Sequence, residues 1–425
     1  MVDHLGARRV VPGLTDTELL RVLQPVSAAE DADASRLDTA VAAERFARAA
    51  LSTAIEPGDL DAGRLVGTLG AVGLLRAITE GADAVGVHED GRIGECLARW
   101  RPRLSLTEAV KTLDRAARIG ARLVTPESTL WPGGFDALED GRPLALWVRG
   151  DTGRMSGLAR SVALVGARAS TRYGEHVAME SAAGLADRGF TIVSGGAYGI
   201  DAAAHRAALL SGGVTIAFLA GGADRLYPAG NSELLRRVAA EGLLIAELPP
   251  GATPTRWRFL MRNRLIAAAA TATVVVEAGH RSGSLNTAGH AAQMGRPLGA
   301  VPGSVLSPAS AGCHRLIREY GATCVTTTEE MAELADPLGT GPRPGSGDDP
   351  DTDDSAGSGG SGSSDDPKRS VLVELRRSRR VSADEIAARS ALPFSTVAAV
   401  LGRLDLAGRA RERDGGWTLV DKRCV

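Results

Sequence analysis

Residues 161–201 have the sequence SVALVGARASTRYGEHVAMESAAGLADRGFTIVSGGAYGID, and this stretch decides the fold. Two apolar runs, at 161–166 and 191–196, each end in glycine, and a segment with helical periodicity lies between them. Apolar runs separated by a helix are typical of a βαβ unit, in which a helix connects two parallel strands. The stretch therefore predicts a parallel sheet.

The same alternation continues toward the C-terminus. Further strands are predicted at 214–222, 243–248, 271–278, 297–303 and 322–327. The helices between the strands are predicted at Glu175–Arg188, Ile200–Leu210, Ser232–Ala240, Arg262–Ala270, Ser284–Met294 and Cys313–Tyr320. Continuous apolar strands spaced by helices indicate an α/β fold, here a Rossmann-like, mostly parallel sheet that is covered on both faces.

Four parts are predicted along the 425 residues. Residues 14–55 and 105–118 carry helical periodicity, and residues 1–118 are predicted to form an N-terminal helical domain of the SAM or helix-hairpin-helix kind. Residues 119–336 form the Rossmann-like domain, which short strands within 119–150 extend at its start. Residues 337–367 are almost entirely Gly, Ser, Pro and Asp and predict a disordered acidic linker, either a solvated spacer or a mimic of a phosphate backbone.

The last part, residues 368–425, has the pattern of a winged helix. Ser382 and Glu385 form a predicted capping box at the start of a helix. A third helix is predicted to end at Gly408, and the run RARERDGGWTLV predicts two short strands around a Gly-Gly turn. A helix, a helix-turn-helix and a β-hairpin in this order indicate a winged-helix domain.

Composition excludes several classes of protein. The formal net charge is −2, so the chain as a whole is not a basic nucleic-acid-binding protein. The four cysteines have no C-x-x-C spacing, which argues against a zinc site or a disulfide framework and fits a reducing cytosol. No run approaches the ~18 apolar residues of a membrane span. We expect a cytoplasmic protein, outside the membrane, that uses no metal or cofactor.

Charge is unevenly distributed along the chain. Residues 160–320 contain sixteen arginines and ten acidic residues, so this region is net basic within a slightly acidic chain. Lysine occurs only at Lys111, Lys368 and Lys422. Contacts with phosphate must therefore be made almost entirely by planar guanidinium groups and backbone N–H groups. Any nucleic-acid site is expected in this region.

The loop after 161–166 is a candidate phosphate site. Gly166 allows close approach of the backbone, Arg168 and Arg172 supply guanidinium groups, and the helix that follows offers free N–H groups. Tight packing also requires glycine, but two arginines within one turn favour phosphate binding.

The loop after 191–196 contains Gly195 and Gly199 in the run SGGAYGID. This run is not a strict G-x-G-x-x-G, and no acidic residue is placed at the end of the following strand to hold a ribose. NAD binding is therefore not expected. Asp201 is interpreted as a capping acid of the next helix, so a bound anion would lie away from the helix axis.

The later loops add aromatic residues and arginine. Tyr227 either stacks on a base or packs against its own loop. In RWRFLMRNRLIA, arginines are interleaved with aromatic residues, a pattern typical of nucleic-acid-binding proteins. Arg262, Asn263 and Arg264 are predicted to begin a helix, whose unpaired N–H groups would add to their charge.

Another helix is predicted to follow Arg281, Ser282 and Gly283. These residues either bind phosphate at the start of the helix or, in the case of Ser282, cap it. Four such loops at one edge of a sheet are difficult to explain by packing alone.

In this order, the loops resemble the DprA (Smf) family of DNA-processing proteins. The matching runs are VGARASTRYG, SGGAYGIDAAAH, AGGADRLYPAGN, AELPPG, RFLMRNRLIA, VVVEAGHRSGSLNTAGHA and VPGS. The resemblance is strong over 119–330 and also fits the helical and winged-helix parts. Many members carry a lysine just after the Tyr-Pro-x-x-Asn run, where this chain has Ser232 and Glu233, and an asparagine where it has His314.

The resemblance implies a protein without enzymatic activity that binds single-stranded DNA, forms a homodimer and loads the recombinase RecA onto incoming strands during natural transformation. It implies a binding site that includes Gly166, Arg168, Gly195, Gly199, Arg262, Asn263, Arg264, Arg281, Ser282 and Gly283. The loop patterns add Arg172 and Tyr227 to this set.

Two other functions stay open. A nucleotide-processing enzyme similar to phosphoribohydrolases would use Glu247 and Glu277, at two strand ends, as acid and base. The P-G-G-x-G-T-x-x-E run of those enzymes is absent from this chain. A sequence-specific regulator would read duplex DNA through the winged helix, but Arg403 is the single cation of its third predicted helix.

Overall fold

The computed structural model describes residues 11–28, 38–87 and 91–337 and, nearer the C-terminus, residues 371, 374–375, 380–390, 397, 401, 404, 410–413 and 416–419. The chain divides into two compact units, Met1–Gly347 and Asp348–Val425, and each is described by itself. The predicted linker, apart from residue 337, lies outside the described residues.

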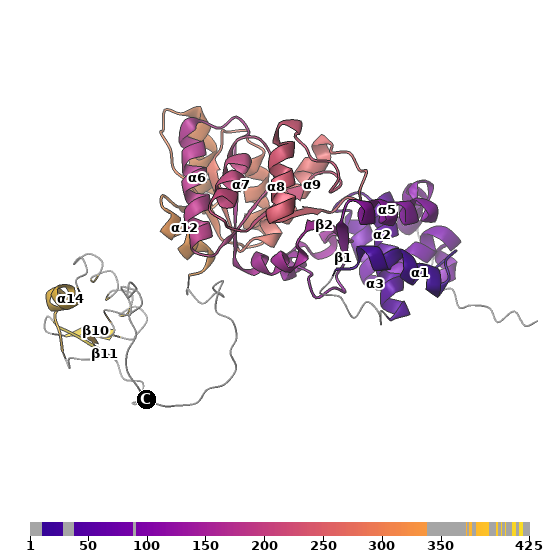
Figure 1. Ribbon diagram of the computed structural model, residues 1–425, viewed down its shortest axis with the longest axis horizontal. Helices are drawn as coiled ribbons and strands as arrows, with labels where there is room; N and C mark the ends of the chain where they lie inside the picture. The colour runs from indigo at the N-terminus through magenta and orange to yellow at the C-terminus, as the bar shows by residue number, and fades with distance from the viewer. Residues whose placement is uncertain are drawn as a thin grey trace, which may run out of the picture. The chain divides into compact units, whose positions relative to one another are not determined.

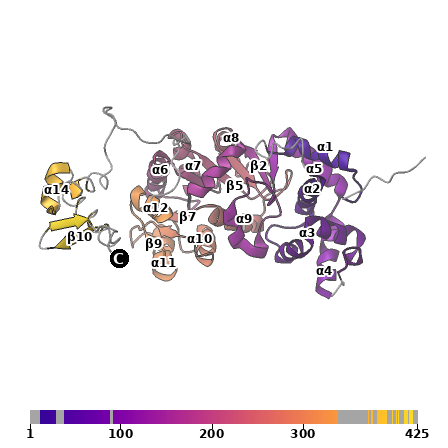
Figure 2. The ribbon, with the colours of Figure 1, turned by 90° about the horizontal axis from the view of Figure 1, so that it is seen from below.

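The first unit is built around a nine-stranded sheet, which Figures 1 and 2 show in two views. Its strands are β1 (Ala121–Val124), β2 (Leu146–Gly150), β3 (Ser161–Gly166), β4 (Thr191–Ser194), β5 (Thr215–Leu219), β6 (Leu243–Ala246), β7 (Ala272–Glu277), β8 (Leu298–Ala300) and β9 (Thr323–Cys324). Their order is β1-β2-β6-β5-β4-β3-β7-β8-β9. The pairs β1–β2 and β2–β6 are antiparallel, and every other pair is parallel, which confirms the predicted fold class.

The direction of winding reverses at β3. The chain passes from β3 through β4 and β5 to β6 on one side, and then returns to place β7 on the other side of β3. Val162 of β3 is paired in register with Ile192 of β4 and with Ala272 of β7. In open α/β sheets a ligand binds outside the carboxyl ends of the strands at such a reversal. The loops that follow β3, β4 and β7 are therefore the first place to look for a site.

Helices cover both faces of the sheet (Figure 2). One face packs against α6 (Arg172–Asp187), α7 (Ile200–Leu210) and α12 (Thr328–Ala335), with α8 (Ser232–Glu241) near the β5–β6 edge. The other face packs against α9 (Arg256–Ala269), α10 (Ser284–Gln293) and α11 (Ala311–Glu319). Side chains of β5 alternate between the two faces, because Ile216 and Phe218 lie in one apolar cluster while Ala217 and Leu219 lie in another.

The start of α9 differs from the prediction. The helix begins at Arg256, six residues before the predicted start at Arg262, and the hydroxyl of Thr255 caps it by accepting from the N–H of Arg258 at 3.3 Å. Arg262, Asn263 and Arg264 therefore lie in the middle of a helix, where the backbone N–H groups are already bonded. The prediction that these three residues supply free N–H groups to a phosphate is wrong.

Among the described residues before the sheet, the α-helices are α1 (Asp16–Leu23), α2 (Thr39–Ala54), α3 (Leu60–Glu80), α4 (Gly91–Trp100) and α5 (Leu106–Arg118). The helix α3 bends at Gly70, where φ is +74°, and the carboxylate of Glu44 accepts there from the N–H groups of Ala71 and Val72. These helices share one apolar cluster with the sheet, in which Phe46 and Trp147 are both fully buried. A boundary between independent domains at residue 118 stays a prediction.

The second unit contains α14 (Ala383–Ser390) and an antiparallel pair of strands, β10 (Ala410–Arg413) and β11 (Gly416–Leu419). An isolated bridge joins Val381 to Trp417 of β11. An apolar cluster that includes Val371, Ile386 and Leu401 forms its core. The third predicted helix of this unit lies largely outside the described residues. Within the described parts of both units, every helix is too short or too polar to cross a membrane.

His205 of α7 makes the stability of the first unit depend on pH. The side chain is fully buried, and its Nδ1 lies 2.7 Å from the hydroxyl of Thr215, which itself donates to the carbonyl of Ile192. His205 Nδ1 is therefore the donor of this bond, and the ring is neutral. Burial, aided by the positive charge of Arg262, lowers the pKa of His205 to about 3.

We predict that acid destabilises the wild-type protein more than the variant His205→Gln. The unfolded chain protonates this histidine near pH 6.5 and the folded chain only near pH 3, so protons favour unfolding between these values. The loss is about 1.4 kcal/mol per pH unit below 6.5, or roughly 2 kcal/mol at pH 5. Urea unfolding at pH 7 and pH 5 measures the difference, and equal losses in both proteins would contradict the prediction.

Candidate nucleic-acid interface

A carboxylate of the chain itself occupies the start of α6. Thr171 donates to Glu277 through its N–H, at 2.8 Å, and through its hydroxyl, at 2.6 Å. Glu277 is the last residue of β7 and is only 2% exposed. The Thr171 hydroxyl also accepts from the N–H of Gly174, so it caps the helix. The amide of Thr171 is thus bonded to Glu277 and is not free for a phosphate.

A second internal carboxylate holds the loop after β4. Asp201 accepts from the N–H groups of Gly195, at 3.2 Å, and Ala197, at 3.3 Å. The side chain is buried in the first turn of α7, and this burial raises its pKa. Asp201 therefore satisfies amides that a bound anion would otherwise use.

The guanidinium group of Arg262 lies beneath the same loop. Its Nη1 donates to the carbonyl oxygens of Gly195, at 2.6 Å, and Phe218, at 2.5 Å. Arg262 is 6% exposed, and burial lowers its pKa to about 10, while the negative charge of Asp201 acts in the opposite direction. A Cβ atom at Gly195 would collide with this guanidinium group. Arg262 thus binds the backbone of its own chain.

Two of the other three predicted glycines, Gly166 and Gly199, also serve packing. Gly199 has a φ of +75°, and a Cβ atom there would collide with the carbonyl oxygen of Ala167. A Cβ atom at Gly166 would come within 2.5 Å of Ile200 of α7. These glycines allow the loops after β3 and β4 to lie against each other, which is a structural role that the sequence pattern alone does not distinguish from ligand binding.

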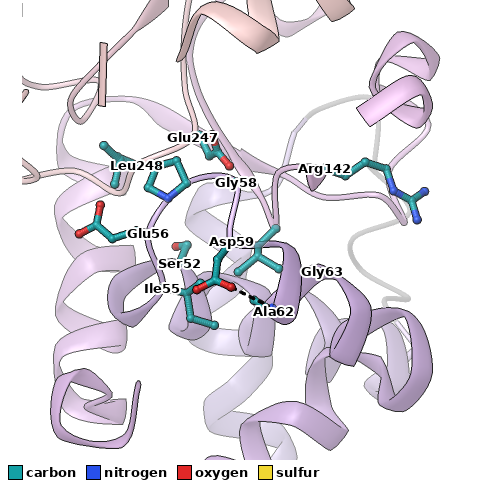
Figure 3. A pocket seen from close by; sticks show the side chains of 12 residues that line it. Ser52, Ile55, Glu56, Gly58, Asp59, Ala62, Gly63, Arg142, Glu247 and Leu248 are labelled. Atoms are coloured by element: carbon teal, nitrogen blue, oxygen red, sulfur yellow. Dashed lines mark hydrogen bonds between the residues drawn. The ribbon is translucent and has the colours of Figure 1, made fainter. Parts of the chain in front are cut away.

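Arg264 and Asn263 point in different directions from Arg262. Residues two positions apart on a helix point about 200° apart, and Arg264 forms a buried ion pair with Glu247, whose Oε1 lies 2.7 Å from Nη2. This pair lies next to Gly58, where the N-terminal helices meet the sheet; Figure 3 shows Glu247 and Gly58 side by side. Asn263 faces the loop that follows β7, and its side chain donates to the side-chain oxygen of Asn286 at 3.3 Å.

Arg225, on the loop after β5, is exposed but lies 3.8 Å from the carboxylate of Asp224. Four other arginines near the carboxyl ends of the strands are also exposed. They are Arg168, Arg172, Arg256 and Arg281. Within the described part of the chain, none of them has a carboxylate within ion-pairing distance. Elsewhere on the surface, Arg236 is paired with Glu233 and Arg237 with Glu241.

The ring of Phe259 lies between Arg168 and the ring of Tyr227 and contacts both. The guanidinium carbon of Arg168 lies 5.1 Å from the centre of the half-buried Phe259 ring. The centre of the Tyr227 ring lies 5.6 Å from the centre of the Phe259 ring. Trp257, two residues earlier on α9, is 58% exposed, and Tyr227 is 51% exposed. Tyr227 therefore packs against α9 and still presents half of its surface to solvent. Tyr198, whose hydroxyl accepts from the N–H of Gly230, is also exposed.

We define the aromatic-arginine surface by five residues: Arg168, Phe259 and Tyr227, which contact one another in turn, and Tyr198 and Trp257, which are exposed on neighbouring segments at the same edge of the sheet. Sequence reasoning included Arg168 and Tyr227 in the site, noted the aromatic pattern around Trp257 and Phe259, and did not select Tyr198. The missing signal is exposure, since a large aromatic residue in a sequence is more often buried than half exposed.

The loop between β7 and α10 is open to solvent. Gly283 stands at the N-cap position of α10 and makes no side-chain cap, and a Cβ atom there would meet open space. The hydroxyl of Ser282 lies 2.7 Å from that of Ser284. Arg281 is exposed beside them. The Ser282 hydroxyl also accepts from the N–H of Ser284, the first residue of α10, at 3.4 Å, so it satisfies an amide at the helix start from the position before the N-cap, while Arg281 stays exposed.

The two carboxylates proposed for catalysis are far apart. Glu247 follows β6 and Glu277 ends β7, and three strands, β5, β4 and β3, lie between them. Four strand spacings amount to roughly 19 Å. Carboxylates that act as an acid and base pair lie within about 10 Å of each other. The geometry therefore does not bring this pair to one substrate.

Comparisons with known proteins agree with this fold. The family described as DNA recombination-mediator protein A matches residues 122–336, and the DprA winged helix domain matches residues 358–416. A putative DNA processing protein DprA of Mycobacterium tuberculosis is 43% identical over 385 residues, which cover 87% of this chain and 93% of that protein. The X-ray structure of DNA processing protein A from Streptococcus pneumoniae is similar at 30% identity with a TM-score of 0.56, covering 69% of this chain and 97% of that chain.

We predict that Arg262→Ala destabilises the fold by about 3 kcal/mol or more. The substitution leaves two buried carbonyl oxygens without a donor and removes the positive charge that balances Asp201. Arg168→Ala is the control, because an exposed arginine contributes within about 0.5 kcal/mol. Chemical unfolding measures both variants, and equal midpoints for the two would show that the Arg262 contacts do not hold the loops.

Proposed function

This chain belongs to the DprA family of DNA recombination-mediator proteins, and from that premise we propose that it binds single-stranded DNA on the aromatic-arginine surface. The observation that carries the proposal is the combination of half-exposed aromatic rings with an accessible guanidinium group at the carboxyl edge of the sheet. Unpaired bases stack on such rings, and the guanidinium group binds the phosphate between them. In a duplex the faces of the bases are stacked on one another, so single strands are the preferred ligand.

The exposed arginines extend this surface along the edge of the sheet. Arg168 and Arg172 lie on the loop after β3 and at the start of α6, Arg281 lies on the loop after β7, and Arg256 begins α9. Contacts to phosphate carry no sequence information, and stacking tolerates every base. We therefore propose binding without sequence preference, in which Arg262 and Arg264 support the surface from beneath.

Family membership supports the wider role. We propose that the protein acts as a homodimer in the cytoplasm, protects incoming single strands and loads the recombinase RecA onto them during natural transformation. The buried and widely separated Glu247 and Glu277 argue against the nucleotide-processing enzyme, so we propose a binding protein without catalytic activity. Release of a free base from a nucleotide incubated with the protein would contradict this part.

We predict that Arg168→Ala weakens binding to every single-stranded sequence and makes it less sensitive to salt. Each phosphate contact with a single strand contributes about 0.7 to the slope of log K against log salt concentration, so the slope falls by about that amount. Fluorescence anisotropy with single- and double-stranded oligonucleotides at several salt concentrations gives both quantities. Arg236→Ala is the matched control, because Arg236 is exposed but paired with Glu233.

Two results would count against the proposal. A wild-type protein that binds duplex as tightly as single strands would contradict the stacking mode. An unchanged salt slope in Arg168→Ala would show that this arginine contacts no phosphate.

We predict that Trp257→Ala lowers single-strand affinity by roughly 5- to 150-fold, which corresponds to about 1–3 kcal/mol for one stacked base. The side chain is 58% exposed, so its removal leaves the fold intact. Trp257→Phe keeps an aromatic face and should retain most of the affinity. Equal losses in the two variants, measured by the same anisotropy assay, would indicate that Trp257 does not act by stacking.

A further inference from the structure

The first turn of α9 is anchored by a residue of the N-terminal helices. Arg258 donates to both carboxylate oxygens of Glu56, from Nε at 3.0 Å and from Nη2 at 2.8 Å. Its Nη1 donates to the carbonyl of Thr253 at 2.8 Å. The Arg258 side chain is 18% exposed. Each of the three nitrogen atoms of this guanidinium group thus donates within the protein, and the Glu56 carboxylate balances its charge.

The ion pair belongs to a wider junction between the N-terminal helices and the segment from β6 to α9. Glu56 lies between α2 and α3, at the rim of a small cleft that Glu247 and Leu248 also line (Figure 3). On the α5 side, Arg115 donates to the carbonyl of Pro250 at 3.0 Å. The N-terminal helices thus hold the connection that leads into α9 at two points.

Arg258 lies between the two aromatic residues that α9 contributes to the aromatic-arginine surface. Trp257 and Phe259 are its neighbours in sequence, and each points about 100° away from it around the helix. Phe259 in turn contacts the guanidinium group of Arg168 and the ring of Tyr227. A shift of the first turn of α9 therefore moves Trp257 and Phe259 together and changes the contacts of Phe259 with Arg168 and Tyr227.

We propose that Glu56 is a positioning residue, which holds the first turn of α9 through Arg258 and thereby sets the affinity for single-stranded DNA without touching it. The effect on DNA rests on the proposed function, whereas the effect on α9 does not. A bidentate pair between carboxylate and guanidinium fixes direction as well as distance, which suits this role. The structural alternative is that the pair only adds to the general contact between the helices and the sheet.

The chain offers a matched control for that alternative. Arg48 of α2 pairs with Glu127 at 2.8 Å, and this pair also joins the N-terminal helices to the sheet region, but it does not involve α9. Glu56→Gln and Glu127→Gln each remove one charge from such a pair and keep the shape of the side chain. A role in general contact affects both variants alike, and a role in positioning affects Glu56→Gln alone.

The experiment uses the full-length chain and two measurements. Anisotropy gives the affinity for a single-stranded oligonucleotide and its salt slope. Hydrogen exchange without DNA reports on the amides of Arg258 and Phe259, which are bonded to the side chain and carbonyl of Thr255. For Glu56→Gln we expect a loss of affinity of roughly two- to thirtyfold, an unchanged salt slope and faster exchange at these two amides. Arg258→Gln should give the same changes, and the double variant should lose no more than either single one.

Several outcomes would overturn the proposal. The proposal fails if Glu56→Gln changes neither the affinity for single-stranded DNA nor the amide exchange of α9, or changes only one of them. It also fails if Glu127→Gln changes both quantities as much as Glu56→Gln does. A salt slope that falls by about 0.7 in Arg258→Gln would show that this arginine contacts phosphate instead. If the wild-type protein binds no single-stranded DNA, the proposed function fails, and the exchange measurement alone decides whether Glu56 positions α9.

Discussion

The rest of the site depends on the buried guanidinium group of Arg262. From the middle of α9 it donates to carbonyl oxygens next to the carboxyl ends of β4 and β5, and so attaches the helix to the edge of the sheet at which a ligand is expected. A buried cation is stable only when its hydrogen bonds are satisfied and its charge is balanced. The two carbonyls provide the first condition and Asp201 provides the second. With α9 fixed in this way, its first turn lies next to the loops that carry Arg168 and Tyr227.

The fold could be predicted because its strands are buried on both faces. Strands such as β3 and β7 consist almost entirely of apolar residues, and the amphipathic helices between them leave little choice other than a parallel sheet. The start of α9 could not be placed in the same way. The sequence suggested a short alanine-rich helix with Arg262 and Arg264 accessible at its start, whereas the helix begins at Arg256 and these two arginines are buried in its middle. A sequence does not distinguish a buried arginine from an exposed one.

The loops of the candidate site could be predicted, but the roles of individual residues within them could not. Arg168, Arg262, Arg264 and Arg281 look equivalent in the sequence, since each lies in an arginine-rich or glycine-rich run near a strand end. The rotation of α9 separates them, because it turns Arg262 toward the sheet and Arg264 toward Glu247, while Arg168 and Arg281 stay exposed. Only the last two remain free for a ligand. Tyr198 was missed for a similar reason, because the half exposure of a tyrosine cannot be inferred from its neighbours in sequence.

The positions of Glu277 and Asp201 are the reason why we place the proposed ligand surface outside the strand ends rather than at the helix N-termini between them. Helix N-termini at a reversal of strand order commonly bind the phosphates of an enclosed nucleotide. Here the carboxylate of Glu277 takes that position at α6 and the carboxylate of Asp201 takes it at α7, so a second anion would meet like charge at both. The accessible positive charge and the exposed rings lie farther out, on loops and on the first turn of α9. A surface of this kind suits a polymer that passes across it, and its geometry then depends on the elements that hold α9 in place.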